Sequence, residues 1–140
     1  MLKIALADVR TFGVDLHRPE CVLATEAGDL FVAHLGHGVL HIAPDGRQTP
    51  IGNVGEVDGI PWIPNGLAWM ADGSFLVANM GAAGGLWRLE RDGRLSLVLD
   101  RIDGVPIGAT NFVVRDRQDR IWVAITTRHW PISQAFAGVG

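Results

Sequence analysis

A segment of 15 residues recurs three times in this 140-residue chain, and no other feature restricts its fold as much. Residues 20–34, 65–79 and 111–125 align without a gap, so their first residues are 65 − 20 = 45 and 111 − 65 = 46 positions apart. Each segment holds an apolar run, a polar turn and a second apolar run, which is the pattern of two short strands joined by a turn. A unit of about 45 residues repeated along a chain indicates a repeat architecture.

The rest of each unit completes the pattern. Residues 38–51 and 85–99 each hold two further strand-like runs around an Asp-Gly pair. Four antiparallel strands in about 45 residues make one blade of a β-propeller. We therefore predict an all-β chain, a β-propeller with about two and a half four-stranded blades. A two-sheet sandwich is the structural alternative, but a sandwich does not require a repeat of this length.

The predicted repeats cover residues of about 18–62, 63–106 and 107–140, the last one shorter, within a single incomplete propeller domain over 1–140. Propellers typically need four to eight blades to close. We therefore expect a fragment, a truncated reading frame, or a subunit that completes a ring by association. The open end is expected to expose an apolar blade face, and self-association through that end is the predicted protein partnership.

Glycine makes up 18 of the 140 residues, nearly twice the usual share of roughly 7%. Five of these glycines follow an aspartate between apolar runs, and Asp-Gly is a strong signal for a tight hairpin turn because that turn needs positive φ. The pairs begin at residues 45, 58, 72, 92 and 103. Glycine usage therefore supports many short antiparallel strands.

Charge and cysteine content exclude several classes of function. The formal net charge is −3 and the sequence has no block of Lys or Arg, so neither nucleic acid nor a membrane surface is an expected partner. No apolar segment approaches the roughly 18 residues of a membrane span. Cys21 is the one cysteine, so no intrachain disulfide can form. The expected location is the cytoplasm.

Glu20, Asn65 and Asn111 occupy the same position at the head of the three aligned segments. In a propeller the innermost strands run along the central channel, so equivalent residues at one end of them converge. One carboxylate and two amide oxygens suit a divalent cation. A cation would also offset the cost of placing Glu20 directly before an apolar, buried run. The alternative is that the two asparagines are ordinary turn residues at strand starts.

Residues 18–24, 63–68, 86–94 and 109–128, in this order and spacing, resemble the senescence-marker-protein, gluconolactonase and luciferin-regenerating-enzyme family. Its members are six-bladed propellers related to strictosidine-synthase-like proteins, so this chain resembles their N-terminal half. The resemblance implies a metal-dependent hydrolase of lactones or similar esters, with calcium or zinc as the cation. It implies that Glu20 is a metal ligand and that Asn111 helps to hold substrate or metal-bound water.

Two departures limit what the resemblance implies. Asn65 lies in an Asn-Gly pair similar to a metal-binding one of the family, but in an earlier blade, so we assign it only to the channel lining. Ala109 stands where some members carry an arginine near the substrate, which leaves sugar-lactone specificity open. The ligands of later blades have no counterpart here. The isolated chain is therefore expected to have little or no hydrolase activity.

The alternatives are a non-catalytic propeller that binds or scaffolds partners, and an inactive truncated product. His34, His37 and His41 have a spacing that invites a zinc hypothesis, but they straddle a predicted hairpin, and His34 aligns with Asn79 and Ile125 rather than with other ligands. Surface or internally bonded histidines are the preferred interpretation. We expect Cys21 to be a buried, unreactive thiol, and Trp62, Trp69, Trp87 and Trp122 to belong to the core.

Overall fold

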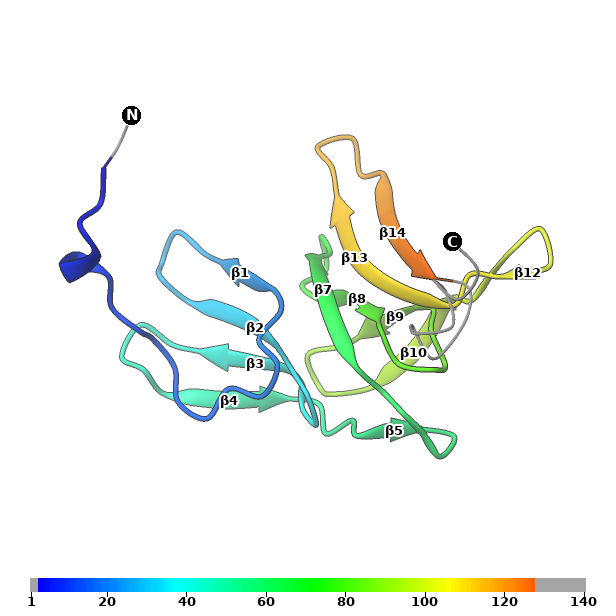
Figure 1. The fold of residues 1–140 in the computed structure, drawn as a ribbon, viewed down its shortest axis with the longest axis horizontal. Helices are drawn as coiled ribbons and strands as arrows, with labels where there is room; N and C mark the ends of the chain where they lie inside the picture. The colour runs from blue at the N-terminus through cyan, green and yellow to red at the C-terminus, as the bar shows by residue number, and fades with distance from the viewer. Residues whose placement is uncertain (1–2, 128–140) are drawn as a thin grey trace, which may run out of the picture.

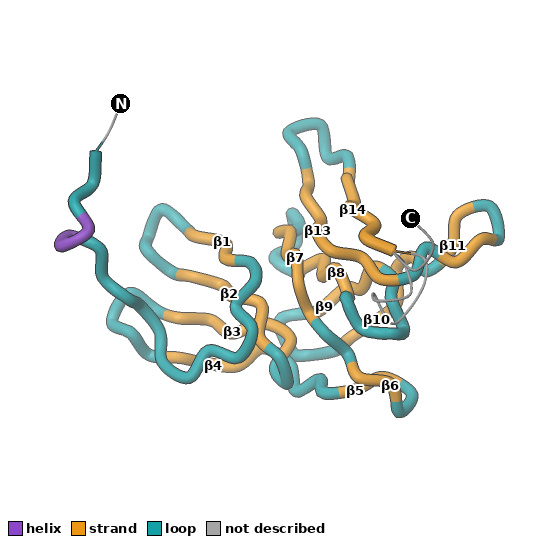
Figure 2. Tube along the Cα trace, viewed as in Figure 1, coloured by secondary structure: helices purple, strands orange, loops and turns teal. Residues whose placement is uncertain are grey.

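The computed structural model describes residues 3–127. Over this range the chain is made of short strands and turns, with the 3-10 turn η1 (Leu6–Asp8) as its only helical element. Figures 1 and 2 show the strands gathered into separate small sheets that follow one another along the chain. No helix within 3–127 is long and apolar enough to cross a membrane. The strands are β1 (Val22–Ala24), β2 (Leu30–His34), β3 (Gly38–Ile42), β4 (Gln48–Ile51), β5 (Glu56–Val57), β6 (Ile60–Pro61), β7 (Pro64–Trp69), β8 (Phe75–Asn79), β9 (Leu86–Leu89), β10 (Leu95–Leu99), β11 (Arg101–Ile102), β12 (Val105–Pro106), β13 (Ala109–Arg115) and β14 (Ile121–Thr127).

Two four-stranded antiparallel sheets form first, in the orders β1-β2-β3-β4 and β7-β8-β9-β10. A third sheet begins with β13 and β14, and the two-stranded ribbons β5–β6 and β11–β12 connect successive sheets. We call the three sheets the first, second and third blade. The strand β7 packs against both β1 and β13, so the first strands of the three blades lie next to one another. The predicted all-β fold with four-stranded blades is confirmed.

Asp-Gly pairs make the two connecting ribbons. Asp58 and Gly59 have φ of 52° and 74°, and Asp103 and Gly104 have φ of 51° and 77°. Positive φ at both central residues is the signature of the type I′ turn, whose twist matches that of a two-residue hairpin. The prediction of tight hairpins at these pairs is therefore confirmed.

Each blade presents one face to the blade before it, the backward face, and one to the blade after it, the forward face. Neighbouring residues of a strand point to opposite faces. Phe31 of the first blade packs in one cluster with Val77 of the second blade. Leu76 of the second blade packs in a further cluster with Val123 of the third. The repeat thus places its large forward residue and its backward valine at fixed positions in every blade.

The backward face of the first blade is covered by the chain itself. Val32, Leu40 and Ile42 form a buried cluster against which Leu16 packs. The backbone of Val14 accepts from and donates to the side-chain amide of Gln48, at 3.0 and 2.7 Å. The segment 13–17 therefore lies along this sheet, as the blue strip beside β4 in Figure 1 shows.

The tryptophans follow the blade faces. Trp62 and Trp87 are buried as predicted, and Trp69 is partly buried. Trp122 is 57% exposed, so its assignment to the core is wrong. Trp122 occupies the forward position of the third blade. The strands β13 and β14 cover the same position of the second blade, but no described sheet covers it in the third.

Candidate functional site

The candidate site lies where the first strands of the three blades begin. Asn65 is the second residue of β7, Asn111 the third residue of β13, and Glu20 comes two residues before β1. The backbone N–H of Leu67 lies 3.4 Å from the Cys21 sulfur, which places the start of β1 beside β7. Together with the contact between β7 and β13, this puts the three sequence-predicted residues at one end of the three strands.

Asn65 is the most firmly held of the three. Its side chain is almost fully buried, and its Nδ2 donates to the backbone carbonyl of Asn111 at 2.8 Å and to the Asn111 Oδ1 at 3.2 Å. These bonds fix the amide plane and direct Nδ2 toward the third blade. The Oδ1 of Asn65 is buried and has no hydrogen-bond partner. An unpaired buried acceptor costs about 1–3 kcal/mol, and buried polar atoms of this kind are rare.

Asn111 is partly exposed, and its backbone and side-chain oxygens both accept from Asn65. An amide oxygen has two lone pairs, so the Oδ1 keeps one acceptor position. The structure therefore joins the two asparagines directly, which alignment of the repeat did not predict. A matching repeat position indicates proximity, but only the three-dimensional structure shows that one amide donates to the other.

The exposure of the Glu20 side chain differs from what the sequence predicted. Its side chain is 46% exposed, and its Oε1 lies 3.4 Å from a guanidinium nitrogen of Arg18. Arg18 has φ of 58°, and its carbonyl accepts from the Glu20 N–H at 2.9 Å, so a tight turn brings the two side chains together. The expectation of a poorly solvated carboxylate is therefore wrong. Solvent and Arg18 compensate the charge.

Close backbone contact explains why glycine follows Asn65 at the head of β7. A Cβ added to Gly66 would lie 2.5 Å from the Cα of Phe112 and 2.8 Å from the backbone nitrogen of Val113. Cys21, at the equivalent position of the first blade, is 7% exposed and packs against the backbone of Leu67. Burial raises the pKa of its thiol, and this shift outweighs the opposing effect of its contact with Leu67. The predicted buried thiol is confirmed.

The donor set is incomplete for a metal by itself. Within residues 3–127 there is no group of three or more His, Cys, Asp or Glu side chains that could hold an ion. Glu20 supplies one carboxylate, and Asn65 and Asn111 add neutral amide oxygens to it. Calcium takes six to eight oxygen ligands, so further donors are required.

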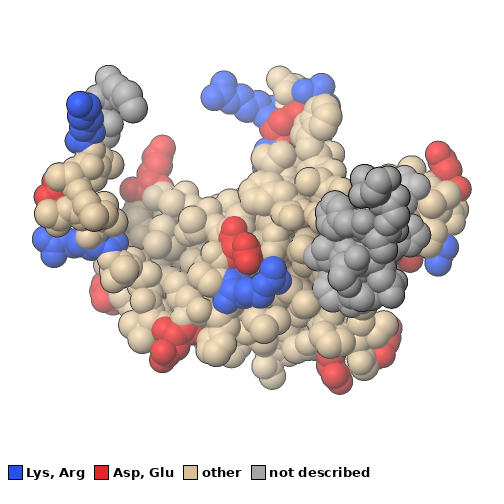
Figure 3. Space-filling model, in the orientation of Figure 1, with Lys and Arg blue, Asp and Glu red and all other residues tan. Residues whose placement is uncertain are grey.

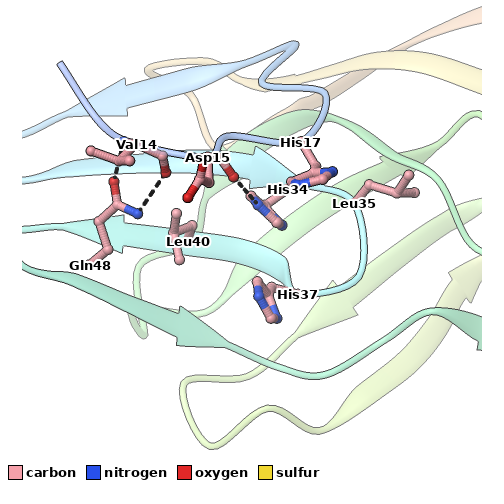
Figure 4. A pocket seen from close by; sticks show the side chains of 8 residues that line it. All are labelled: Val14, Asp15, His17, His34, Leu35, His37, Leu40 and Gln48. Atoms are coloured by element: carbon pink, nitrogen blue, oxygen red, sulfur yellow. Dashed lines mark hydrogen bonds between the residues drawn. The ribbon is translucent and has the colours of Figure 1, made fainter.

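A pocket beside the histidines has a volume of about 630 Å³ and is shown in Figure 4. His34 and His37 stack with ring centroids 4.7 Å apart, and His17 lies 5.5 Å from His34. The Nε2 of His34 is 3.4 Å from the carbonyl of Asp15. Stacked rings direct their lone pairs side by side rather than at one point, so this pocket does not favour zinc. The participation of His17 was not predicted, because it comes from the separate segment 13–17.

His41 belongs to a different contact. Its Nε2 lies 2.7 Å from the Asp29 carboxylate, and its ring stacks on Phe31 with centroids 4.7 Å apart. The interpretation of His41 as an internally bonded side chain agrees with this geometry. Because its ring faces Phe31 and Asp29 rather than the pocket of Figure 4, the three histidines of the sequence motif do not form one site.

Solved structures show what this arrangement is similar to. A virginiamycin B lyase from Staphylococcus aureus matches with a TM-score of 0.57 and 14% identity over 76% of this chain and 34% of its own. A gluconolactonase from Xanthomonas campestris matches with a TM-score of 0.57 and 22% identity over 69% of this chain and 31% of its own. A streptogramin B lyase matches with a TM-score of 0.56 and 14% identity over 76% of this chain and 33% of its own. Comparison with protein-family models and with curated proteins gave no match.

These neighbours are β-propellers, and the chain spans about a third of their length. The predicted partial propeller is therefore confirmed. A gluconolactonase among the neighbours agrees with the family resemblance that the sequence motifs indicate. At these identities the likeness shows the fold. Because lyases and a gluconolactonase share the fold, the reaction has to be inferred from the site itself.

Proposed function

We propose that this chain forms part of a metal-dependent hydrolase of lactones or similar esters, and that Glu20, Asn65 and Asn111 contribute oxygens to its cation site. The observation that supports this proposal is the unpaired, buried Oδ1 of Asn65. Its Nδ2 is fixed by two bonds to Asn111, so the orientation of the oxygen is fixed as well. A buried oxygen without a donor is the kind of atom that a cation satisfies.

The three residues would make different contributions to the cation site: Glu20 supplies the negative charge, and Asn65 and Asn111 supply neutral oxygens at fixed positions. Glu20 carries the negative charge and remains accessible, at the end of strands where Asn65 and Asn111 are already ordered. Asn111 keeps an acceptor position with which it can orient a water or a substrate hydroxyl. When bound, a divalent cation such as calcium or zinc polarises a lactone carbonyl and lowers the pKa of a bound water. The Arg18 guanidinium would have to release Glu20 for it to serve as a ligand.

A non-catalytic binding or scaffolding propeller is the second candidate, and one observation favours it. Glu20 and Asn65 each have partners within the chain, Arg18 and Asn111, that hold them in place without any ion. On this account the asparagine pair fastens the second blade to the third. The two candidates differ in one testable property, the binding of a cation that depends on Glu20.

Calorimetric titration of the purified chain with calcium tests the proposal. Calcium is suitable because it selects oxygen ligands and binds poorly to imidazoles such as those of the pocket in Figure 4. We expect saturable binding that Glu20→Gln weakens at least tenfold. The matched control is Glu26→Gln, an exposed carboxylate in the turn after β1, which should leave binding unchanged.

Two outcomes would contradict the proposal: no calcium binding by the intact chain, or binding that Glu20→Gln leaves unchanged. A lactonase and esterase assay on the same samples tests the separate expectation of an inactive isolated chain. Turnover that depends on both calcium and Glu20 would show that the three donors suffice for catalysis.

A further inference from the structure

Each asparagine of the candidate site lies at a β-bulge, where the regular pairing of its strand is interrupted. The register of β7 on β8 shifts at Asn65 and Gly66, which together oppose one residue of β8. The register of β13 on β14 shifts at Asn111, which has no partner on β14. Bulges redirect side chains and are over-represented next to active sites. The directions of the two amides therefore depend on what holds each bulge in place.

Asn79, the last residue of β8, holds the chain that leads into the first bulge. Its side chain is fully buried, and its Oδ1 accepts from the backbone N–H of Ile63 at 2.9 Å and of Gly81 at 2.8 Å. Its Nδ2 donates to the carbonyl of Gly84 at 2.9 Å. Because Ile63 is two residues before Asn65, this one amide fixes the entry to β7 together with the loop after β8.

Thr110, directly before Asn111, has the corresponding role at the second bulge and is also fully buried. Its Oγ1 accepts from the backbone N–H of Asn79 at 2.8 Å and donates to the carbonyl of Gly85 at 2.7 Å. The N–H of Gly85 in turn donates to the carbonyl of Gly108 at 3.0 Å. Asn79 and Thr110 thus belong to one buried network of hydrogen bonds that reaches the chain beside both asparagines.

The loop 80–85 between β8 and β9 packs tightly against the segments that lead into β7 and β13. A Cβ added to Gly81 would collide with the carbonyl of Pro61, and one added to Gly84 would collide with the carbonyl of Gly108. Both obstacles are backbone atoms, so no side-chain rotation can relieve them. The network therefore lies between three backbone segments in close contact, and it has little freedom to shift.

The blade repeat does not require these two side chains. In the other two blades, the position of Asn79 holds His34 and Ile125. The position of Thr110 holds a proline in both, and proline has neither a hydroxyl nor a backbone N–H. The network instead connects the second and third blades, which are the two that carry the bonded asparagines. Its residues therefore serve a need of this place in the chain rather than of blade construction.

We propose that Asn79 and Thr110 are positioning residues of the candidate site, which hold the two bulges so that Asn65 bonds to Asn111 and directs its free Oδ1 one way. The role of that oxygen as a cation ligand rests on the proposed function. Both residues act through the backbone beside the asparagines. Ligands that are ordered before binding lose little freedom when the ion arrives.

The charge distribution of the chain makes this positioning important for affinity. The formal net charge is only −3, and the face shown in Figure 3 carries acidic and basic groups side by side. A weak, mixed charge distribution attracts a cation little from a distance. The affinity for calcium therefore depends on how firmly the few ligands are held, and it should fall when the network is broken.

Hydrogen exchange of the Asn65 side-chain amide, measured by NMR without calcium, tests the positioning. Thr110→Val keeps the shape of the side chain but removes both bonds of its hydroxyl, so we expect roughly tenfold faster exchange. Thr110→Ser keeps the hydroxyl and should exchange like the unchanged chain. Ser74→Ala is the matched control, because Ser74 is also buried, donates to Asp72 at 2.7 Å and precedes the opposite end of β8. It should lower stability without changing the exchange of Asn65.

Calcium titration of the same variants separates this inference from the proposed function. In a chain that binds calcium, Thr110→Val should weaken the binding roughly tenfold, whereas Thr110→Ser and Ser74→Ala should not. If the intact chain binds no calcium, the proposed function fails, and the exchange measurement still decides whether Thr110 positions Asn65.

Three results would overturn the positioning role. Unchanged exchange of Asn65 in Thr110→Val would show that the asparagine pair is held without the network. Equal acceleration in Thr110→Val and Ser74→Ala would assign the effect to a general loss of stability. Calcium binding that Thr110→Val leaves intact would separate the network from the cation site. Circular dichroism verifies that each variant is folded, and Thr110→Ala replaces Thr110→Val if that variant does not fold.

Discussion

Replacing Gly66 by alanine tests the contact on which the candidate site depends. Gly66 directly follows Asn65 in β7, and it has no positive φ, so the only obstacle to a side chain there is space. An alanine Cβ at this position would lie 2.5 Å from the Phe112 Cα, 2.8 Å from the Val113 nitrogen and 3.0 Å from the Asn111 oxygen. All three atoms belong to the backbone of β13, so no side-chain rotation can relieve the clash.

The cost follows from this geometry. Carbon atoms in good contact are about 3.5–4.0 Å apart, so β13 must move by about 1 Å. Overpacking of this kind costs about 1–3 kcal/mol. The same movement lengthens the 2.8 and 3.2 Å bonds from Asn65 to Asn111, and losing them adds about 1 kcal/mol. We therefore expect the free energy of unfolding to fall by about 2–4 kcal/mol.

Urea denaturation, followed by circular dichroism and by tryptophan fluorescence, to which buried Trp62 contributes, measures this loss. With a urea m-value of about 1.5 kcal/mol per M, the midpoint should fall by about 1–3 M. Gly55→Ala is the matched control, because Gly55 also lacks positive φ and an added Cβ there would meet no atom within 4 Å. It should keep or slightly raise the midpoint, since alanine reduces the freedom of the unfolded chain.

Equal midpoints for Gly66→Ala and Gly55→Ala would refute the reasoning. Such a result would mean that β7 and β13 are not in backbone contact, and that Asn65 and Asn111 are not held together by the two bonds between them. A loss confined to Gly66→Ala, without any change in m-value, would support the contact.

Three further predictions concern single side chains. Asn79→Ala should lower the free energy of unfolding by about 2–4 kcal/mol in urea denaturation, because the buried Asn79 side chain accepts from Ile63 and Gly81 and donates to Gly84. The control Asn53→Ala should change this free energy little, because Asn53 is exposed. Cys21 should react with a thiol reagent at pH 8 only after denaturant is added, because it is buried with a raised pKa; rapid reaction of the folded chain would contradict its burial. Asp116 should titrate by NMR with a pKa of about 2, because the indole of Trp122 and then Arg120 hydrogen-bond its ionised form. Its contribution to stability is therefore present above about pH 4 and is lost as the pH falls through about 2. Asp116→Asn should reduce this acid sensitivity, and an ordinary pKa for Asp116 would argue against the bond to Trp122.

The sequence was sufficient to predict the fold because the repeat is visible in one dimension. Spacing of 45 and 46 residues, alternating apolar runs and Asp-Gly turns are all local properties, and they predict blades without knowledge of tertiary contacts. The convergence of the first strands also follows from blade geometry. Glu20, Asn65 and Asn111 lie at or just before the starts of these strands, and their roles are a proposal.

What the sequence did not predict depends on neighbours that a linear pattern does not encode. The exposure of Glu20 results from a tight turn at Arg18, whose positive φ is unusual for a residue with a side chain. Trp122 looks like a core residue in any strand pattern, but its exposure depends on whether another sheet lies over it. His17 joins His34 only because segment 13–17 folds back along the first blade.

The most direct test of the proposed cation site is an NMR titration of the isotope-labelled 140-residue chain with calcium, observing the side-chain amides of Asn65 and Asn111. We expect saturable shifts of both amides and of the backbone amide of Gly66, with much smaller shifts in Glu20→Gln. Unchanged Asn65 and Asn111 signals at millimolar calcium would contradict the cation site. In that case the asparagine pair would serve only to join the second and third blades.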